Sequence, residues 1–153
     1  MVHHSAIGTR DVDLSLVFWR DGLGFEVQFD ATFEGDWPGL FGGSSTTLRS
    51  VFLGDPSVPD SGLVELVELG EMGPPAEPGD GPAVGFFLLS LYADLDQVLP
   101  RLAALGVGGP LRLITVHGVR LAVVSDPNGV RVELMDTVAR SNLAQLSGPG
   151  ATG

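Results

Sequence analysis

The order of predicted elements repeats once along the 153-residue chain, and this repeat limits the possible folds more than any other feature. In each half, the hydrophobic pattern predicts a strand, then a helix that ends in Leu-Gly, then three strands. The two Leu-Gly ends, at Gly24 and Gly106, lie 82 positions apart. Self-similarity at a fixed spacing is typical of a duplicated module. The chain is therefore predicted to be an α+β protein made of two tandem βαβββ modules.

The first module is predicted from helical and alternating apolar positions. Leu16, Trp19 and Leu23 fall on one face of a helix that Asp11 or Asp13 can cap. A stretch rich in glycine and aromatic residues lies between the second and third strands and is predicted to be a loop. The expected strands are 3–9, 25–32, 46–53 and 63–69.

The second module repeats this order. Its expected helix, 94–105, begins with Asp94 and Gln97 in a capping-box pattern. Pro100 removes one backbone hydrogen bond, which predicts a kink or a loose first turn. The sequence Asp-Pro-Asn-Gly at 126–129 predicts a turn before the last strand. The expected strands are 85–92, 111–116, 119–124 and 130–136.

Composition along the chain suggests where the modules begin and end. Residues 71–82 are rich in glycine and proline, which is typical of a linker, so the modules are expected at 1–70 and 83–137. The segment 138–153 has no sustained period and ends in small residues. It is therefore predicted to be a flexible tail.

Composition also restricts the surroundings and the partners. No apolar run approaches the length of a membrane helix, and no secretory signal is visible at the start of the sequence. The chain contains no cysteine, which makes a cytoplasmic location the expectation. Its net charge is −11, with eight arginines and no lysine. Nucleic acid and anionic membranes are therefore not expected as partners.

Three strand residues are candidates for chemistry. His4 shares its strand face with small residues two and four positions further on, which leave room around the imidazole. Glu65 and Glu133 lie among apolar residues in corresponding strands of the two modules. Burying a carboxylate there is costly unless a metal ion or an arginine pairs with it. For Glu65, that arginine would be Arg49 or Arg131.

Three segments carry a resemblance to a known family. Residues 4–25 resemble the opening of vicinal oxygen chelate proteins, a strand that begins with His, an Asp-Leu turn and a helix that ends in Leu-Gly-Phe. Residues 126–134, with the sequence DPNGVRVEL, resemble the closing signature of that family. Residues 64–66 resemble the fourth strand of glyoxalase I-like members. The match spans residues 3–137 and implies a cup-shaped, barrel-like mixed sheet with helices outside.

The resemblance implies a metal site carried by His4, Glu65 and Glu133, in which one of the two glutamates also acts as the catalytic acid–base group. Metal-dependent members usually carry a second His where the 82-residue offset sets Phe86 opposite His4. Phenylalanine cannot coordinate a cation, which argues against an extradiol dioxygenase. One imidazole and two carboxylates still suffice for Zn, Ni, Mn or Fe. His117, in a predicted turn, is a candidate replacement ligand.

Aromatic and basic residues complete the expected substrate site. Trp37 and Phe41 would form a lid or wall over the cup, or would instead belong to the core. Phe86 would line the floor of the cup and make it more apolar. Arg131 shares a strand face with Glu133. It would either hold an anionic group of the substrate or neutralise that glutamate.

The sequence leaves two functions open. A divalent-metal-dependent lyase or isomerase, acting on a small, fairly apolar substrate with vicinal oxygens, is slightly favoured because of Glu65. The alternative is a metal-free protein of the bleomycin-resistance type that sequesters an aromatic or apolar small molecule, which Phe86 and the Trp37 loop favour. Enzyme status, the presence of a metal ion and the identity of the substrate stay open. A homodimer is expected, with the site formed either within one chain or across the dimer.

Overall fold

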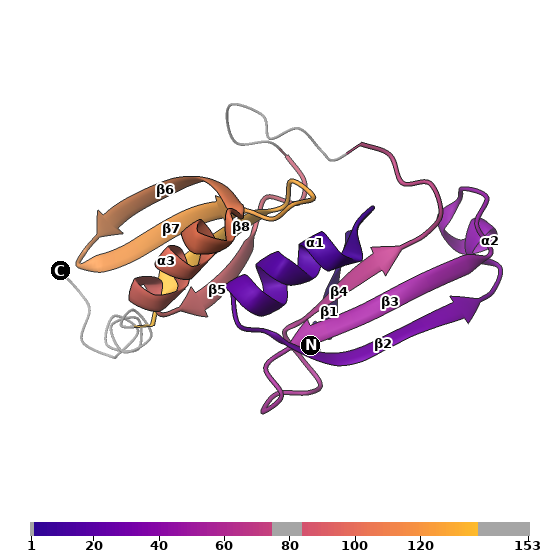
Figure 1. Ribbon diagram of the computed structural model, residues 1–153, viewed down its shortest axis with the longest axis horizontal. Coiled ribbons are helices and arrows are strands. Elements are labelled where there is room, and N and C mark those ends of the chain that lie inside the picture. The colour runs from indigo at the N-terminus through magenta and orange to yellow at the C-terminus, as the bar shows by residue number, and fades with distance from the viewer. Residues whose placement is uncertain (1, 75–83, 138–153) are drawn as a thin grey trace.

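The computed structural model describes residues 2–74 and 84–137, which form two modules of the same design (Figure 1). The first module contains β1 (His4–Gly8), α1 (Val12–Leu16), the π-helix η1 (Val17–Gly22), β2 (Glu26–Glu34), α2 (Trp37–Phe41), β3 (Thr47–Gly54) and β4 (Leu63–Glu68). The second contains β5 (Leu89–Ala93), α3 (Leu95–Leu105), β6 (Gly108–Val116), β7 (Val119–Ser125) and β8 (Arg131–Asp136).

Each module has its own four-stranded mixed sheet, and the two sheets have the same topology. The strand orders are β1-β4-β3-β2 and β5-β8-β7-β6. In each sheet the first strand pairs in parallel with the last, and the other pairs are antiparallel. The predicted α+β fold of two tandem βαβββ modules is therefore confirmed.

The segment from the N-cap to the glycine that follows the helix is one residue longer in the first module than in the second. Thirteen positions separate the N-cap Asp11 from Gly24, whereas twelve separate the N-cap Asp94 from Gly106. The π-helix η1 accommodates the extra residue, because its wider turn spans five residues, as in the hydrogen bond from the Leu23 amide to the Phe18 carbonyl (2.9 Å).

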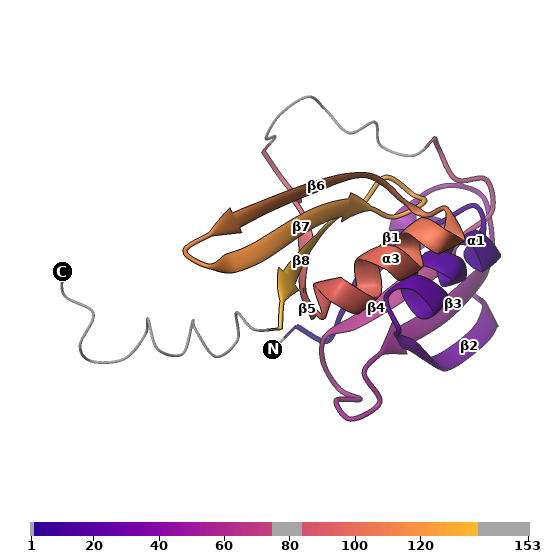
Figure 2. The ribbon, with the colours of Figure 1, turned by 60° about the vertical axis from the view of Figure 1, so that its left-hand side comes forward.

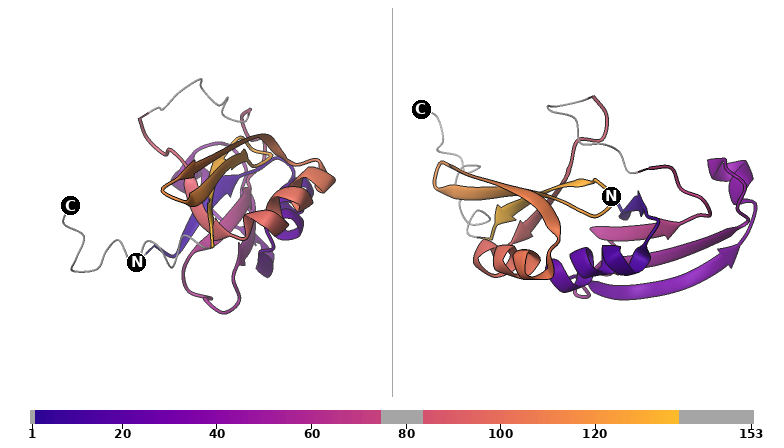
Figure 3. Two further views of the ribbon diagram at one scale, coloured as in Figure 1. Left: turned by 90° about the vertical axis from the view of Figure 1, so that its left-hand side faces the viewer. Right: turned by 45° about the horizontal axis from the view of Figure 1, so that its top comes forward.

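The two modules share one hydrophobic core, which lies around their helices. Helix α1 with η1 and helix α3 lie side by side at the junction, and the sheets extend to either side (Figures 2 and 3). Gly22 allows this approach, since a Cβ there would lie 2.5 Å from Leu102 Cδ2. The Arg101 side chain also donates to the Gly22 carbonyl (2.7 Å). Buried members of the core from both modules include Phe18, Trp19, Val51, Leu66, Leu95, Val98, Leu102, Val132 and Leu134.

A polar network links the Asp-Pro-Asn-Gly turn of the second module to the first helix. The Asp126 carboxylate accepts hydrogen bonds from the backbone amides of Asn128 (2.9 Å) and Val130 (2.8 Å). The Asn128 side-chain amide donates to the Ser15 hydroxyl (3.0 Å), which in turn lies 2.9 Å from the Thr9 hydroxyl. The predicted turn thus also fixes one module against the other.

Several expected boundaries differ from the structure. The stretch predicted as a loop contains α2, because Asp36 caps its start and Pro38 suits a first helical turn. Strand β5 begins four residues later than expected, after Gly85, which has a φ of 115°. Strand β6 begins earlier, through an irregular register between Gly108 and Arg112. Helix α3 is continuous through Pro100.

Two further expectations concern segments at the edges of the described chain. The predicted tail, 138–153, and residues 75–82 of the predicted linker lie outside the described residues. Among the residues described, no helix combines the length and the apolar character that crossing a bilayer requires.

Candidate functional site

A cavity of about 520 Å³ opens on the face of the first sheet that is turned away from the helices. Its wall is largely aromatic, with rings from β2, α2 and β3, and its floor carries three polar side chains. The aromatic residues are Phe29, Phe33, Trp37, Phe41 and Phe52, and the polar ones are His4, Ser50 and Glu65.

Strand alternation explains why these residues meet on one face. On β1, His4 shares the cavity face with Ala6 and Gly8, whose small size leaves room above the sheet. Glu65 faces the same cavity from β4 and lies opposite Ala6 in the parallel pair. The structure therefore brings together His4 and Glu65, two of the three residues predicted to bind a metal ion.

The Glu65 carboxylate is held by two partners. One carboxylate oxygen lies 3.2 Å from His4 Nε2, and the other accepts a hydrogen bond from the Ser50 hydroxyl at 2.5 Å. Neither arginine considered from the sequence is its partner, since Arg49 pairs with Asp30 instead (2.9 Å). The Glu65 side chain is only 14% exposed, so its charge is costly to bury, and these two contacts offset part of that cost.

The His4 ring is fixed from three sides. Its edge packs against the Phe52 ring, with the ring centres 5.1 Å apart. Its Nδ1 atom lies 2.8 Å from Nδ1 of His3, the preceding residue. In a neutral His4 that donates from Nε2 to Glu65, the Nδ1 atom accepts a hydrogen bond from His3. This arrangement sets the His4 tautomer and keeps Nε2 directed at the carboxylate.

The helix α2 forms one wall of the cavity. The rings of Trp37 and Phe41 are stacked, with their centres 6.1 Å apart and their planes inclined by 7°. The Trp37 indole donates to the Phe33 carbonyl (3.2 Å), which ties α2 to the end of β2. Phe41 is 63% exposed. Trp37 and Phe41 therefore form a wall of the cavity and do not belong to the hydrophobic core.

In the second module, Glu133 occupies the position that Glu65 has in the first. Ser90 lies opposite Glu133 in the parallel pair of β5 and β8, as Ala6 lies opposite Glu65 in the first sheet. The Ser90 hydroxyl donates to Glu133 (2.7 Å). Hence each module holds one glutamate at the same place, with a serine hydroxyl bonded to it.

The strand register changes the residue that corresponds to His4. The 82-residue offset placed Phe86 there, but counting back from Ser90 places Leu88 at that position. Phe86 is 71% exposed and lines a different hollow, which it shares with Ile7 and Leu89. Neither Phe86 nor Leu88 can coordinate a metal ion, so the second module still lacks an imidazole at this place.

Arg131 and His117 lie outside the His4 cavity. The Arg131 guanidinium stacks over the Phe87 ring, 5.2 Å from its centre. No ion pair among the described residues joins Arg131 to Glu133, so neutralisation of that glutamate is not observed. His117 lies in the turn between β6 and β7, with a φ of 48°, at the tip of a hairpin that points away from the first module (Figure 1).

The donor set of one chain fits part of a metal site. Two ligands with bonds of about 2.1 Å to one cation lie roughly 3.0–3.4 Å apart, and His4 Nε2 and Glu65 are 3.2 Å apart. However, within residues 2–74 and 84–137 no group of three His, Asp or Glu side chains is close enough to hold an ion. A metal ion at His4 and Glu65 would therefore need a third protein ligand from outside this cluster.

Ser50, Phe52 and Phe29 line the cavity but were not predicted as site residues. Alternation along β3 places Ser50 and Phe52 on the same face, and this signal was available. Glu65 lies on this same face because Phe52 pairs with Glu65 in the register of β3 against β4. The pattern of residue types does not supply that register.

Comparisons with known proteins agree with this architecture. The sequence profile of the Glyoxalase/Bleomycin resistance protein/Dioxygenase superfamily matches residues 1–134. The lactoylglutathione lyase-like protein terB from Aspergillus terreus is 34% identical over 145 residues, which cover 88% of this chain and 74% of that protein.

Solved structures show the same fold at lower sequence identity. A trypanothione-dependent glyoxalase I from Leishmania major has a TM-score of 0.66 and 21% identity, with 99% of each chain covered. A glyoxalase family protein from Bacillus cereus has a TM-score of 0.68 and 20% identity, with 89% of this chain and 92% of the other covered.

Proposed function

Because this chain belongs to the glyoxalase/bleomycin resistance protein/dioxygenase superfamily, we propose that the His4–Glu65 cavity is its binding site for a small, largely apolar molecule with an aromatic part. The observation that carries the proposal is the composition of the cavity, in which five aromatic rings surround one paired histidine and glutamate. Mostly apolar cavities with a few convergent polar groups are typical ligand sites.

The two parts of the cavity suggest how a ligand would be recognised. Stacking against Trp37 and Phe41 would bury the aromatic part of the ligand, and such contacts favour offset or edge-on rings. At the floor, a hydroxyl of the ligand would donate to Glu65, and a carbonyl oxygen would accept from His4. A ligand with both an aromatic ring and an oxygen function would satisfy both parts.

Sequestration of such a molecule is the function that one chain supports best. A single chain supplies all five rings of the aromatic wall. At the same cavity it supplies only two metal-binding side chains among the described residues, His4 and Glu65, which is fewer than a metal site needs. A binding protein needs only the wall and the hydrogen-bonding floor. Trp37, Phe41, His4 and Glu65 would then be the residues that contact the ligand.

A divalent-metal-dependent lyase or isomerase is the second candidate, and the 3.2 Å spacing of His4 and Glu65 favours it. Members of the superfamily often bind divalent metal ions. In a homodimer, Glu133 of a second copy would be the third ligand to Zn, Ni, Mn or Fe. The bound ion would polarise two adjacent oxygens of a substrate, and Glu65 or Glu133 would move a proton.

Titration with a neutral aromatic probe tests the proposed binding site. N-phenyl-1-naphthylamine is added to EDTA-treated protein while the fluorescence of Trp37 and of the probe is followed. We expect saturable binding with one probe per chain and quenching of the Trp37 signal that the Trp37→Phe variant lacks. The Phe33→Ala variant should weaken binding about tenfold, because it removes one of the five rings of the aromatic wall.

The Phe86→Ala variant is the matched control, since Phe86 is an exposed aromatic residue of the other module. Equal loss of affinity in the Phe33 and Phe86 variants, or no saturable binding at all, would contradict the proposed site. The metal-dependent alternative is tested by elemental analysis of protein purified without a His tag. One metal ion per site, lost in Glu65→Gln and in Glu133→Gln but kept in Glu68→Gln, would support it. No metal after EDTA treatment and re-addition would reject it.

A further inference from the structure

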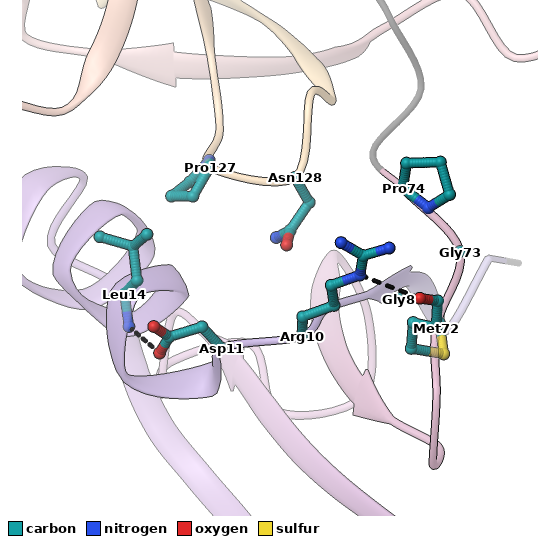
Figure 4. Close-up of a pocket in the computed structure, with 9 residues that line it drawn as sticks. All are labelled: Gly8, Arg10, Asp11, Leu14, Met72, Gly73, Pro74, Pro127 and Asn128. Atoms are coloured by element: carbon teal, nitrogen blue, oxygen red, sulfur yellow. Dashed lines mark hydrogen bonds between the residues drawn. The ribbon is translucent and has the colours of Figure 1, made fainter.

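We propose that a second hollow beside the aromatic cavity is a carboxylate-binding subsite built around Arg10, so that the ligand of this protein is an aromatic acid. This inference rests on the proposed function, because it names the chemical class of the molecule that the aromatic cavity binds. The hollow has a volume of about 400 Å³ and lies where the first module meets the turn at residues 126–129 (Figure 4).

The Arg10 side chain is anchored by one end and leaves the other end in the hollow. Its Nε–H donates to the Met72 carbonyl (2.9 Å). The four remaining N–H groups are on the two terminal nitrogens, and Figure 4 shows these on the side of Asn128 and Pro74. A guanidinium held in this way offers an end-on, two-point contact that matches a carboxylate.

Arg10 also differs in its partners from Arg20, Arg49 and Arg120. Arg20, Arg49 and Arg120 each pair with at least one aspartate at 2.5–2.9 Å. None of the ion pairs within the described part of the chain includes Arg10. In a protein with 19 acidic residues, a cation that faces a hollow without a carboxylate partner is available for an anion from outside.

The Asn128 side chain lies on the side of the hollow across from Arg10, and two hydrogen bonds fix its orientation. Its side-chain nitrogen donates to the Ser15 hydroxyl and to the Asp126 carboxylate, both at 3.0 Å. Because a carboxylate only accepts hydrogen bonds, the amide nitrogen must be the atom at that contact. The amide oxygen is then left to accept a hydrogen bond from a hydroxyl or N–H group of a ligand, and the Asn128 side chain points into the hollow (Figure 4).

The one acidic residue of the hollow is turned toward the helix. The Asp11 carboxylate accepts a hydrogen bond from the Leu14 amide (2.9 Å), on the side away from the Arg10 guanidinium (Figure 4). Apolar side chains also line the hollow, and they include Leu14, Pro74 and Pro127. The hollow therefore combines the Arg10 cation with apolar walls, which suits a carboxylate on an apolar chain, and the Asn128 oxygen would accept only from a separate donor group of the ligand.

Gly8 and Met72 line both the hollow and the aromatic cavity, so a single ligand can reach from one to the other. The absence of a Cβ at Gly8 leaves space that the end of the Met72 side chain occupies, so this side chain lies against β1. An unbranched thioether has few barriers to rotation and can move aside for a ligand. An aromatic ring in the cavity would thus place an acid on a short alkyl chain near Arg10.

Two matched ligands test this inference, 4-(1-naphthyl)butanoate and its primary amide, which has nearly the same shape but no charge. Their affinities are measured by isothermal titration calorimetry in the intact protein. We expect the acid to bind about tenfold more tightly than the amide. The Arg10→Gln variant should bind the acid about tenfold more weakly and the amide within twofold of the wild-type value. Raising the salt concentration should reduce the preference for the acid.

Arg112→Gln is the control, because it makes the same change in charge at an exposed position of β6 in the other module, and it should leave both affinities unchanged. Equal affinities for acid and amide in the wild type, or an acid preference that survives in Arg10→Gln, would overturn the carboxylate subsite. In those outcomes the amide would still bind and still depend on Phe33. If the amide does not bind, the proposed aromatic site itself fails.

Discussion

Trp19 donates its indole N–H to the Asp126 carboxylate at 3.3 Å, across 107 positions of the sequence and with both residues buried. Trp19 belongs to η1 of the first module, and Asp126 begins the turn before β8 of the second. The same carboxylate also organises its own turn through the amides of Asn128 and Val130. One buried aspartate therefore shapes a turn and holds the two modules together.

Trp19→Phe is expected to lower the free energy of unfolding by about 2–4 kcal/mol, because it removes part of a buried ring and leaves Asp126 with one donor fewer. Urea denaturation followed by circular dichroism measures the change. Trp37→Phe is the matched control, since Trp37 lies on the partly exposed wall of the cavity, and it should cost less than about 1 kcal/mol. Equal losses in the two variants would show that the contact with Asp126 contributes little.

The sequence predicted the module order well but not the correspondence of individual positions. Helix ends, N-caps and strand pairs of the two modules are related by different offsets, which are 82 for Gly24 and Gly106, 83 for Asp11 and Asp94, and 84 for Ala6 and Ser90. The offset falls from 84 to 83 because Ala6 lies one residue farther from the N-cap of its helix than Ser90 does. It falls from 83 to 82 at the π-helix. A one-residue insertion leaves the order of the elements unchanged, so the offset measured at the helix ends does not apply to the strands and misplaced Phe86.

The candidate site was predicted in part, for a physical reason. Strand alternation and the family resemblance identified His4 and Glu65, and the structure places them in contact. Ser50 was not identified, because its contact with Glu65 depends on the pairing of two strands. Helix α2 was missed because it has only five residues and depends on a cap at Asp36 and on contacts with β2.

Ser50→Ala is expected to destabilise the protein by about 1–2 kcal/mol, since it removes the hydrogen-bond donor from a largely buried carboxylate. The change is measured as a shift in the urea midpoint at neutral pH. Ser57→Ala removes a hydroxyl that also donates to a carboxylate, that of Asp55, but in an exposed turn, and its effect should be much smaller than that of Ser50→Ala. If both variants unfold alike, Ser50 does not stabilise the charge of Glu65.

Asp96→Asn is expected to lower stability at neutral pH but not in acid. The hydrogen bond and the charge of Arg120 lower the pKa of the Asp96 carboxyl. A carboxyl with a lowered pKa in the folded state stabilises the protein above its unfolded pKa of about 3.9, and this contribution is lost as the pH falls through the folded pKa. The difference in urea midpoint between wild type and variant should therefore shrink from pH 6 to pH 2. A difference for Asp96→Asn that is constant with pH would contradict the role of Arg120.

If the protein binds a metal ion, Leu88→His tests whether Leu88 or Phe86 is the residue of the second module that corresponds to His4. Leu88 holds the place of His4 by strand register, whereas Phe86 holds it by the offset of the helix ends. An added imidazole at the true counterpart would supply a further ligand, so Leu88→His should raise Zn²⁺ affinity about tenfold or more over the wild type. Phe86→His adds the same group two residues away on a strongly exposed side chain and should change the affinity much less. Affinities are measured by competition with a fluorescent zinc chelator in protein without a His tag. A larger gain for Phe86→His would show that the ligand positions follow the helix ends and not the pairing of β5 with β8.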